Sequence, residues 1–342
     1  MQPVLPCLWA LMASYLPAAH LFAPMFEYTQ PMSEVVVSTV SAMDEIIQGL
    51  SCQAAYISPK FFYDAHGSDL FAQITNVPEY YPTRTENAIM AEQGDAIKRE
   101  AGAISSLIEL GAGNCRKAQA LCALLQPQRF VPLDISEAYL LEATADFREK
   151  LPGLAVYPVA SDLTQAIILP THIPPERRLV FYPGSSIGNF DPAHAADLLR
   201  RVRDLLDDDG ALLIGFDLVK EVGVLEAAYD DAAGVTAAFN LNILQHVNAI
   251  IGSDFSEDDW RHVAFFNPVD SRIEMHLEAV AEILVRWPNG ERHFAAGERI
   301  HTENSYKYRA DDFVSLLAAN GFSRSTVWTD AQGWFAVLMA RP

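Results

Sequence analysis

The chain has 342 residues, half of them hydrophobic, and a formal charge of −20 at pH 7; this length allows one elaborated domain or two closely joined ones around a large core. The strong negative charge argues against a nucleic-acid backbone or an anionic membrane surface as partner and favours a protein that acts on small molecules. The four cysteines show no metal-ligand spacing, so we expect reduced thiols in a cytoplasmic protein without bound metal, and we expect a monomer.

Residues 1–32 are apolar, with no charged residue before Glu27. The segment lacks the positive start of a signal peptide, and prolines interrupt it well short of a membrane-spanning helix. We interpret it either as a disordered or weakly packed extension or as an over-long gene start, with Met32 or Met43 as the true first residue. In both cases we expect it to contribute nothing to an active site.

Residues 33–50 have the apolar spacing of a helix. The stretch 58–85 is crowded with aromatic residues and prolines, including Tyr63, Phe71 and Tyr80. We predict a rigid, loop-rich wall here rather than a periodic element. Two interpretations stay open: a patch of aromatic core, or the wall of a pocket whose tyrosines present hydroxyl groups to a substrate.

A short apolar run at 107–110 predicts a buried strand, which is followed by Gly111 and Gly113 and then by a helix that begins near residue 115. Glycine lets a backbone approach a ligand closely, because a Cβ would collide with it. A second strand at 130–133 ends in Asp134, at the distance where nucleotide-binding βαβ units carry the acid that binds ribose hydroxyls. Arg116 stands where a dinucleotide site needs a third glycine. A single nucleoside, most commonly S-adenosylmethionine, is therefore the better prediction, although such glycine pairs also occur as simple tight turns.

Helices and strands continue to alternate, with strands at 155–159, 178–183 and 211–216. This pattern predicts a Rossmann-like α/β sheet, in which ligands bind at the carboxyl ends of the strands. The residues expected to share that edge are Glu109, Asp134, Asp162, Gly184, Asn189 and Asp217. An acid in the position of Asp162 often holds the amino group of adenine.

The alternation breaks after residue 220. A helix at 225–251 and an alternating strand at 272–280 precede a segment at 298–308, and a helix at 311–319 and a strand at 335–339 return to the sheet. We therefore predict an inserted α+β substrate-binding subdomain at 221–305, joined by the N-terminal segment 33–100. The Rossmann-like domain takes 101–220 and 306–342.

Several long strings are far more specific than any glycine motif: 62–71, 78–86, Gly188-Asn189, 228–240 and 272–275. They resemble the L-histidine Nα-methyltransferase family of ergothioneine biosynthesis, from about Cys52 to the C-terminus. The resemblance implies a methyltransferase domain joined to a substrate domain. It also implies trimethylation of the α-amino group of histidine, which gives hercynine and consumes three molecules of S-adenosylmethionine.

By position, the resemblance also implies roles for individual residues. Tyr63, Asn189 and Tyr229 would act on the amino and carboxylate groups of the substrate as catalytic residues. The remaining substrate-binding residues would be Phe71, Tyr80, Gly184, Met275, Glu303 and Ser305, with Glu303 and Ser305 on the imidazole. The cofactor would be bound by Tyr80, Gly111, Gly113, Lys117, Asp134 and Asp162.

The implied reaction asks little of the protein beyond geometry. The sulfonium is a strong methyl donor, so in-line placement of a deprotonated amine is the main requirement. No histidine or carboxylate stands out as a base, and Tyr63 or solvent is the expected proton acceptor.

Three alternatives remain open at this stage. A non-enzymatic nucleoside-binding regulator would share the sheet edge but would need no polar pocket in the insert. An NAD-dependent oxidoreductase would require the third glycine and a group that positions the hydride. A methyltransferase for another amino acid, such as an indole amine, is the nearest rival, and Glu303 argues against it, because a buried carboxylate suits an imidazole better than an indole.

Overall fold

The computed structural model describes residues 41–342, so the predicted extension at 1–32 and the first part of the helix predicted at 33–50 lie outside the described residues. The described part of that helix is α1 (Ala42–Ser51). Its N-terminus is capped by Ser41, whose hydroxyl oxygen accepts a hydrogen bond from the backbone N–H of Asp44 at 3.1 Å. Such a cap satisfies one of the unpaired N–H groups of the first turn.

The larger of the sheets has eight strands in the order β13-β14-β7-β6-β2-β3-β4, with β5 also paired to β3. The strands from β4 to β7 run parallel, and β14 and β13 close the edge in antiparallel fashion. The bounds of its strands are β2 (Ser106–Leu110), β3 (Arg129–Asp134), β4 (Ala155–Val156), β5 (Val159–Ala160), β6 (Arg178–Tyr182), β7 (Ala211–Asp217), β13 (Arg324–Thr329) and β14 (Phe335–Arg341). The predicted Rossmann-like sheet is confirmed.

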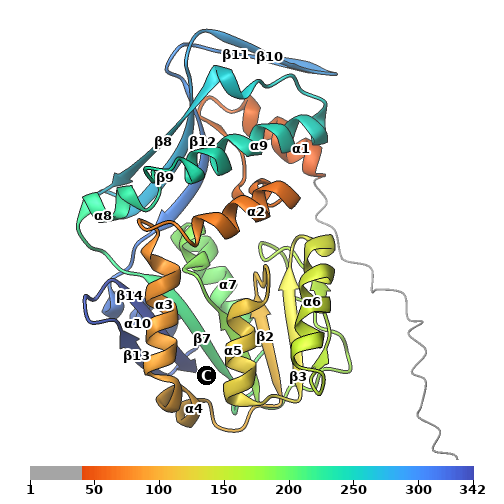
Figure 1. Cartoon of the computed structure of the whole chain (residues 1–342), viewed down its shortest axis with the longest axis vertical. Coiled ribbons are helices and arrows are strands. Elements are labelled where there is room, and N and C mark those ends of the chain that lie inside the picture. The colour runs from red at the N-terminus through yellow and green to blue at the C-terminus, as the bar shows by residue number, and fades with distance from the viewer. Residues whose placement is uncertain (1–40) are drawn as a thin grey trace, which may run out of the picture. The chain divides into compact units, whose positions relative to one another are not determined.

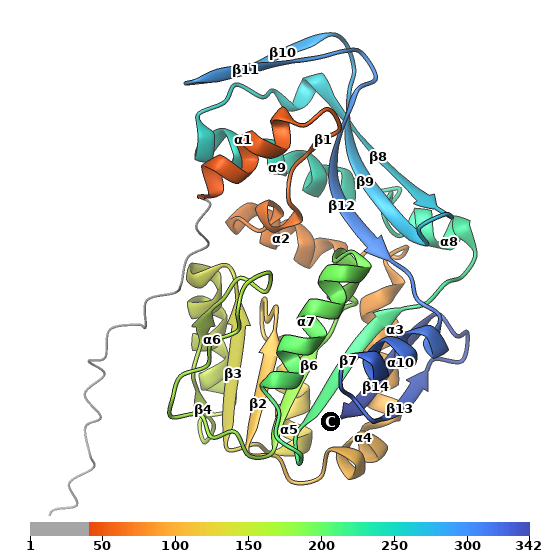
Figure 2. The ribbon, with the colours of Figure 1, turned by 180° about the vertical axis from the view of Figure 1, so that it is seen from behind.

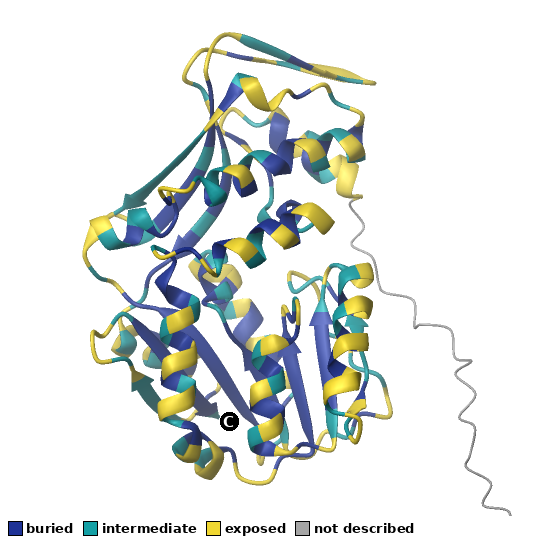
Figure 3. Cartoon of the chain, viewed as in Figure 1, coloured by how far each residue is buried: buried dark blue, intermediate teal, exposed yellow. Residues whose placement is uncertain are grey.

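Helices cover both faces of this sheet. Successive residues of its central strands point to opposite sides, and because these residues are apolar, both faces must be shielded from water. In β2, Leu107 packs into one apolar core and Ile108 into the other. The first core is covered by α3 (Tyr81–Glu92), α4 (Gly94–Ala101), α5 (Arg116–Leu125) and α6 (Glu137–Lys150), and the second by α7 (Pro192–Asp204) and α10 (Ala310–Ala319). Figures 1 and 2 show the two faces, and Figure 3 shows the buried strands between them.

A second sheet lies above the carboxyl ends of the first (Figure 1), in the order β1-β12-β9-β8. Its strands are β1 (Ala55–Tyr56), β8 (Trp260–Asn267), β9 (Arg272–Ala279) and β12 (Arg299–Tyr306), and β10 (Ile283–Trp287) and β11 (Gly290–Phe294) form a separate hairpin. The helical elements of this part are η1 (Pro59–Phe62), α2 (Ala65–Ile74), α8 (Val222–Ala227), α9 (Val235–Ile251) and η3 (Glu257–Asp259). The N-terminal segment as far as Tyr81 shares one apolar core with the inserted segment, which supports our assignment of both to the substrate-binding part. The rest of the predicted N-terminal segment, in α3 and α4, packs on the large sheet instead.

The prediction of a loop-rich wall at 58–85 is wrong, because η1, α2 and the start of α3 lie within it. Helix α2 begins after Asp64, whose carboxylate accepts the backbone N–H of Gly67 at 2.6 Å. A Cβ on Gly67 would lie only 1.8 Å from the carbonyl oxygen of Phe62. The cap and the glycine start the helix, while the density of aromatic residues hides its apolar periodicity.

The prediction of a single helix at 225–251 is also wrong, because residues 228–234 interrupt it. Helix α8 ends at Ala227 and α9 begins at Val235. The carboxylate of Asp231 accepts the backbone N–H groups of Val235 and Thr236 at 3.0 and 2.8 Å. Gly234 has φ +73°, a conformation that favours glycine. This break places Tyr229 in an irregular segment instead of on a helix.

Other predicted elements are confirmed with small changes. The strand expected at 155–159 is split into β4 and β5 on either side of Pro158, which has no N–H to donate to a ladder. The strand at 272–280 is β9, and the segment 298–308 contains β12. Among residues 41–342, no helix has both the length and the apolar character that crossing a membrane would demand.

Candidate active site

A turn after β2 and the end of β3 form the base of a deep cleft. Gly111 and Gly113 have φ of +64° and +49°, and a Cβ on either would meet no atom within 4 Å. Glycine is therefore favoured here by backbone conformation, and the turn borders open space. The carboxylate of Asp134 accepts the backbone N–H of Gly113 at 2.8 Å and that of Ser136 at 3.0 Å. Burial raises the pKa of Asp134, while these N–H bonds oppose the shift.

Every residue predicted to bind the cofactor lines this cleft: Tyr80, Gly111, Gly113, Lys117, Asp134 and Asp162. The set fits a nucleoside, because Asp134 Oδ2 accepts the N–H of Gly113 and Oδ1 that of Ser136, and each oxygen keeps a lone pair for a hydroxyl group. Glu109 also lines the cleft, and its Oε2 has no hydrogen-bond partner among the described residues. Burial raises the pKa of Glu109 well above its usual value.

Besides Asp134, two predicted cofactor residues, Lys117 and Asp162, have side-chain partners in the protein. The ammonium group of Lys117 lies 2.5 Å from the buried carboxylate of Glu86, which also accepts the backbone N–H of Gly184 at 2.9 Å. Asp162 accepts the backbone N–H and the hydroxyl of Thr164 at 2.8 and 2.6 Å. Both side chains thus hold the cleft walls in place, and their contacts to a cofactor remain predictions.

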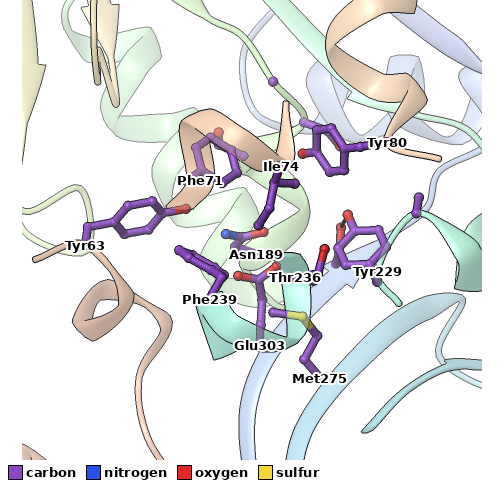
Figure 4. A pocket seen from close by; sticks show the side chains of 15 residues that line it. Tyr63, Phe71, Ile74, Tyr80, Asn189, Tyr229, Thr236, Phe239, Met275 and Glu303 are labelled. Atoms are coloured by element: carbon purple, nitrogen blue, oxygen red, sulfur yellow. Dashed lines mark hydrogen bonds between the residues drawn. The ribbon is translucent and has the colours of Figure 1, made fainter. Parts of the chain in front are cut away.

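A smaller cavity adjoins the cleft. All nine residues predicted to bind the substrate line it: Tyr63, Phe71, Tyr80, Gly184, Asn189, Tyr229, Met275, Glu303 and Ser305. Figure 4 shows the side chains of Tyr63, Asn189 and Glu303 directed toward a common space. The cavity lining missed by the sequence analysis comprises Ile74, Ser185, Ser186, Ala228, Thr236 and Phe239.

Strand periodicity and one close backbone contact bring these residues together. Glu303 and Ser305 are two positions apart on β12 and so point to the same face, and Glu303 pairs with Met275 of β9 in the register. Asn189 ends η2 (Ser186–Asn189), which packs against β12. A Cβ on Gly188 would lie 2.9 Å from the carbonyl oxygen of Tyr306. Glycine at this position therefore lets the loop after β6 meet β12.

The comparisons agree with this geometry. Residues 42–342 match the family model described as histidine-specific methyltransferase, SAM-dependent. The chain belongs to this family. It is 41% identical to a histidine N-alpha-methyltransferase of Mycolicibacterium smegmatis and 37% identical to one of Mycobacterium tuberculosis, in both cases over 86% of this chain and 93% of the relative. It is 31% identical to ergothioneine biosynthesis protein 1 of Schizosaccharomyces pombe, over 69% of this chain and 32% of that protein.

Membership in this family of S-adenosylmethionine-dependent enzymes confirms the predicted cofactor and the assignment as a methyltransferase. It removes the alternatives of a regulator without activity and of an NAD-dependent oxidoreductase. The roles of individual residues remain proposals, because they were carried over by position.

Glu303 offers the cavity a buried polar group that is available to a ligand. The carboxyl group of Glu303 has no hydrogen-bond partner within residues 41–342, and its residue is only 8% exposed. Burial raises the pKa of Glu303 to about 7, although the charge of Lys307 opposes this shift. Burial also raises the pKa values of Tyr63 and Tyr80 well above the usual value. Both phenols therefore stay protonated, and Tyr63 can take up the proton of an amine only if it passes its own proton on.

Asp217 is placed differently from the prediction. It ends β7 as expected, but it lines neither the cleft nor the cavity. Its carboxylate is fully buried between the ammonium groups of Lys307 and Lys220, at 2.9 and 2.6 Å. Neither lysine was expected to have a role from the sequence. The one available signal was that Lys307 stands two positions after Ser305, on the same face of an extended segment.

A possible metal cluster lies on the other face of β9 from Met275. Glu274, His276 and His301 have ligand atoms within 4.8 Å of one another. The carboxylate of Glu274, however, already accepts bonds from Arg272, Asn267 and His276. Burial lowers the pKa of His276 to about 4. We assign no metal to this cluster.

Proposed function

We propose that this protein transfers methyl groups from S-adenosylmethionine to the α-amino group of L-histidine three times, giving hercynine for ergothioneine biosynthesis. One observation carries the choice of histidine: the buried, unpartnered carboxyl group of Glu303 in a cavity that adjoins the nucleoside cleft. The names of the relatives that are 41% and 37% identical support the same substrate.

The connection between the two sites supports methyl transfer. The cleft and the cavity share part of their lining: Tyr63, Phe71, Tyr80, Gly184, Ser186, Asn189 and Glu303. When bound, S-adenosylmethionine supplies an electrophilic methyl group on a sulfonium. A substrate amine held by Asn189 and Tyr63 lies at the junction of the two spaces, where the chain contributes orientation and exclusion of water.

The ring of histidine needs one acceptor and one donor, because a neutral imidazole has one N–H and one bare nitrogen. Glu303 provides the acceptor and Ser305 the donor in our proposal. The thioether of Met275 and the ring of Phe239 supply apolar lining for the rest of the imidazole. Buried polar groups of this kind reject ligands that leave them unpaired.

Tyr63, Phe71 and Tyr80 line the end of the cavity that we assign to the amine, and Phe239 lies between this end and the imidazole. The ring centroids of Tyr63 and Phe71 are 5.9 Å apart, those of Phe71 and Tyr80 are 6.4 Å apart, and those of Phe71 and Phe239 are 6.0 Å apart. Aromatic faces attract alkylated ammonium groups. The wall therefore suits an amine that becomes a quaternary ammonium, which can no longer donate a hydrogen bond.

The proposal extends to location and assembly. We place the enzyme in the cytoplasm as a monomer that needs no nucleic acid or membrane. The support is its charge of −20 and the presence of free thiols at Cys52, Cys115 and Cys122. Size-exclusion chromatography with light scattering tests the monomer, and a dimer would contradict it.

The direct test is to incubate the purified full chain with S-adenosylmethionine and a pool of free amino acids, and to follow the products by mass spectrometry. We expect trimethylhistidine as the end product and acceptance of monomethyl- and dimethylhistidine as substrates. Methylation of another amino acid or of an indole amine in preference to histidine would overturn the proposal.

A further inference from the structure

Lys307 directly follows β12, and its side chain is completely buried. Its ammonium nitrogen lies 2.8 Å from Ser305 Oγ, 3.0 Å from the hydroxyl oxygen of Tyr229 and 2.9 Å from Asp217 Oδ2. Three acceptors thus match the three protons of an ammonium group. Burial lowers the pKa of Lys307, but the charge of Asp217 and the contact to Tyr229 outweigh it, and the net shift is upward. The amine therefore stays charged.

An ammonium group can only donate hydrogen bonds. The hydroxyl oxygens of Tyr229 and Ser305 must therefore both accept from Lys307. These two oxygens are 2.6 Å apart, so one hydroxyl hydrogen lies between them. The second hydroxyl hydrogen has no other acceptor among residues 41–342. Both residues line the substrate cavity, which leaves the cavity as the place where that hydrogen finds an acceptor.

The anchor of Lys307 is itself held rigidly. Asp217 accepts the hydroxyl of Tyr81 at 2.6 Å and the ammonium group of Lys220 at 2.6 Å, and Lys220 also donates to the hydroxyl oxygen of Tyr81. Asp217 ends β7, Tyr81 begins α3, and Lys220 lies three residues beyond β7. Lys307 therefore has one orientation set by the large sheet, and it imposes that orientation on the two cavity hydroxyls.

We propose that Lys307 is a positioning residue that determines specificity, because it turns the Tyr229–Ser305 hydroxyl pair into a hydrogen-bond donor toward the substrate ring. Tyr229 is thereby assigned to the ring, and not to the amino and carboxylate groups as the resemblance implied. The proposal rests on the proposed function. A neutral imidazole then fits in one way only: its bare nitrogen accepts from the hydroxyl pair and its N–H donates to Glu303. Without Lys307, each hydroxyl regains a free lone pair, and the pair serves equally as donor or acceptor.

The test compares L-histidine with β-(2-thienyl)-alanine, whose five-membered ring offers no nitrogen. In Lys307→Met, which removes the donor at similar volume, we expect kcat/KM for histidine to fall about 30- to 100-fold, mainly through KM. The value for thienylalanine should change less than about threefold, because that ring uses neither polar group. Binding of S-adenosylhomocysteine, measured by calorimetry, should be unchanged and reports that the variant is folded.

Lys220→Met is the matched control, since Lys220 contacts the same carboxylate but neither cavity hydroxyl. Without Lys220, Asp217 keeps its contacts to Tyr81 and Lys307 through Oδ2. It should lower the thermal stability and leave the preference for histidine intact. Lys307→Leu is the second variant for the case in which the methionine variant does not fold. Lys307→Gln, which restores a donor without charge, should recover part of the preference.

Two results would overturn this role of Lys307: a histidine preference in Lys307→Met or Lys307→Leu equal to that of the wild type, or an equal loss in Lys220→Met. The proposed function is judged separately on the wild type, which must methylate histidine before any variant is compared.

Discussion

The nucleoside cleft and the substrate cavity are built by different means. At the base of the cleft, backbone N–H groups of Gly113 and Ser136 position the carboxylate of Asp134. The cavity is built from side chains that come from distant parts of the sequence, such as Tyr63, Tyr229 and Glu303. Backbone geometry comes with the sheet and serves any enzyme that binds the same nucleoside. Side-chain placement depends on one particular fold of the insert, so the choice of substrate resides there.

The comparison predicts that changes in the two regions separate cleanly. A change in the cavity should alter the choice of substrate and leave cofactor binding intact. A change in the cleft should do the reverse.

The largest effect is expected from Glu303→Ala. Removing the acceptor of the ring N–H should lower kcat/KM for histidine. The fall should correspond to a loss of about 2–4 kcal/mol in transition-state binding free energy. Binding of S-adenosylhomocysteine should change little, and the preference for histidine over tryptophan should shrink. Glu278→Ala is a suitable control, because Glu278 pairs with Arg261 and Arg299 outside the cavity. If the ratio of kcat/KM for histidine to that for tryptophan were unchanged in Glu303→Ala, Glu303 would not bind the imidazole.

Asp134→Ala tests the opposite side of the comparison. It should weaken binding of S-adenosylmethionine by about 1–3 kcal/mol, the loss expected when hydroxyl groups lose a charged acceptor. The relative preference among amino acids should stay as in the wild type. Titration calorimetry measures the first quantity and competition assays the second. We also expect no binding of NAD, and NAD that bound more tightly than S-adenosylmethionine would contradict the cleft assignment.

The pH dependence sharpens the role of Glu303. Its folded-state pKa of about 7 exceeds the ordinary value of 4.5. Because the folded state holds this proton more tightly than the unfolded state, the contribution of Glu303 to the free energy of unfolding is fully present below pH 4.5. It is lost as the pH rises through 7. Glu303→Gln should therefore gain stability relative to the wild type between pH 5 and 8, by about 1–3 kcal/mol. Thermal unfolding of both proteins across this range is the measurement.

The same ionisation should act on activity with the opposite sign. Only the carboxylate form of Glu303 is a full acceptor for the imidazole N–H, so kcat/KM for histidine should rise through pH 7 in the wild type. This step should be smaller in Glu303→Gln, where only the substrate's own imidazole, with an ordinary pKa of about 6.5, still titrates. A step of equal size in both proteins would assign it to another group.

The smallest effect is expected from Phe71→Leu, which thins the aromatic wall at the amine end of the cavity. The third methylation should slow by about three- to tenfold, because the dimethylated amine loses an aromatic face. The first methylation should change less, and dimethylhistidine should accumulate in the product mixture. A uniform loss over all three steps would mean that Phe71 acts only in packing.

The cleft could be predicted from sequence because its signals are local. The glycines of the turn stand next to the strand that they end, and Asp134 follows the next strand at a fixed distance. The same locality predicted β2, β3, β6 and β7. The break at 228–234 was missed, because Asp231 replaces a helical turn with bonds that no apolar periodicity reveals.

The cavity could be predicted only through the resemblance to a known family. Nothing in the local pattern around Tyr63, Tyr229 or Glu303 says that these side chains meet, since their contact depends on the tertiary fold. The buried Lys307 escaped even the resemblance, because a lysine in a strand-like stretch is expected to be exposed. Its partner Asp217 was expected at the ligand-binding edge of the sheet. The direction of a strand predicts at which edge its last residue lies, but not which side chains that residue contacts.

The contact at Gly188 has a consequence for redesign. The main chain of η2 packs against the main chain of Tyr306. The distance between the bound methyl donor and the bound amino acid is therefore fixed by backbone contact. Substituting side chains in the cavity exchanges the ring that is accepted, while the reach from donor to amine stays constant. Enzymes evolved from this scaffold would thus accept substrates with a different ring readily. They would accept a substrate with a longer or shorter chain between ring and amine only after the backbone at Gly188 had moved.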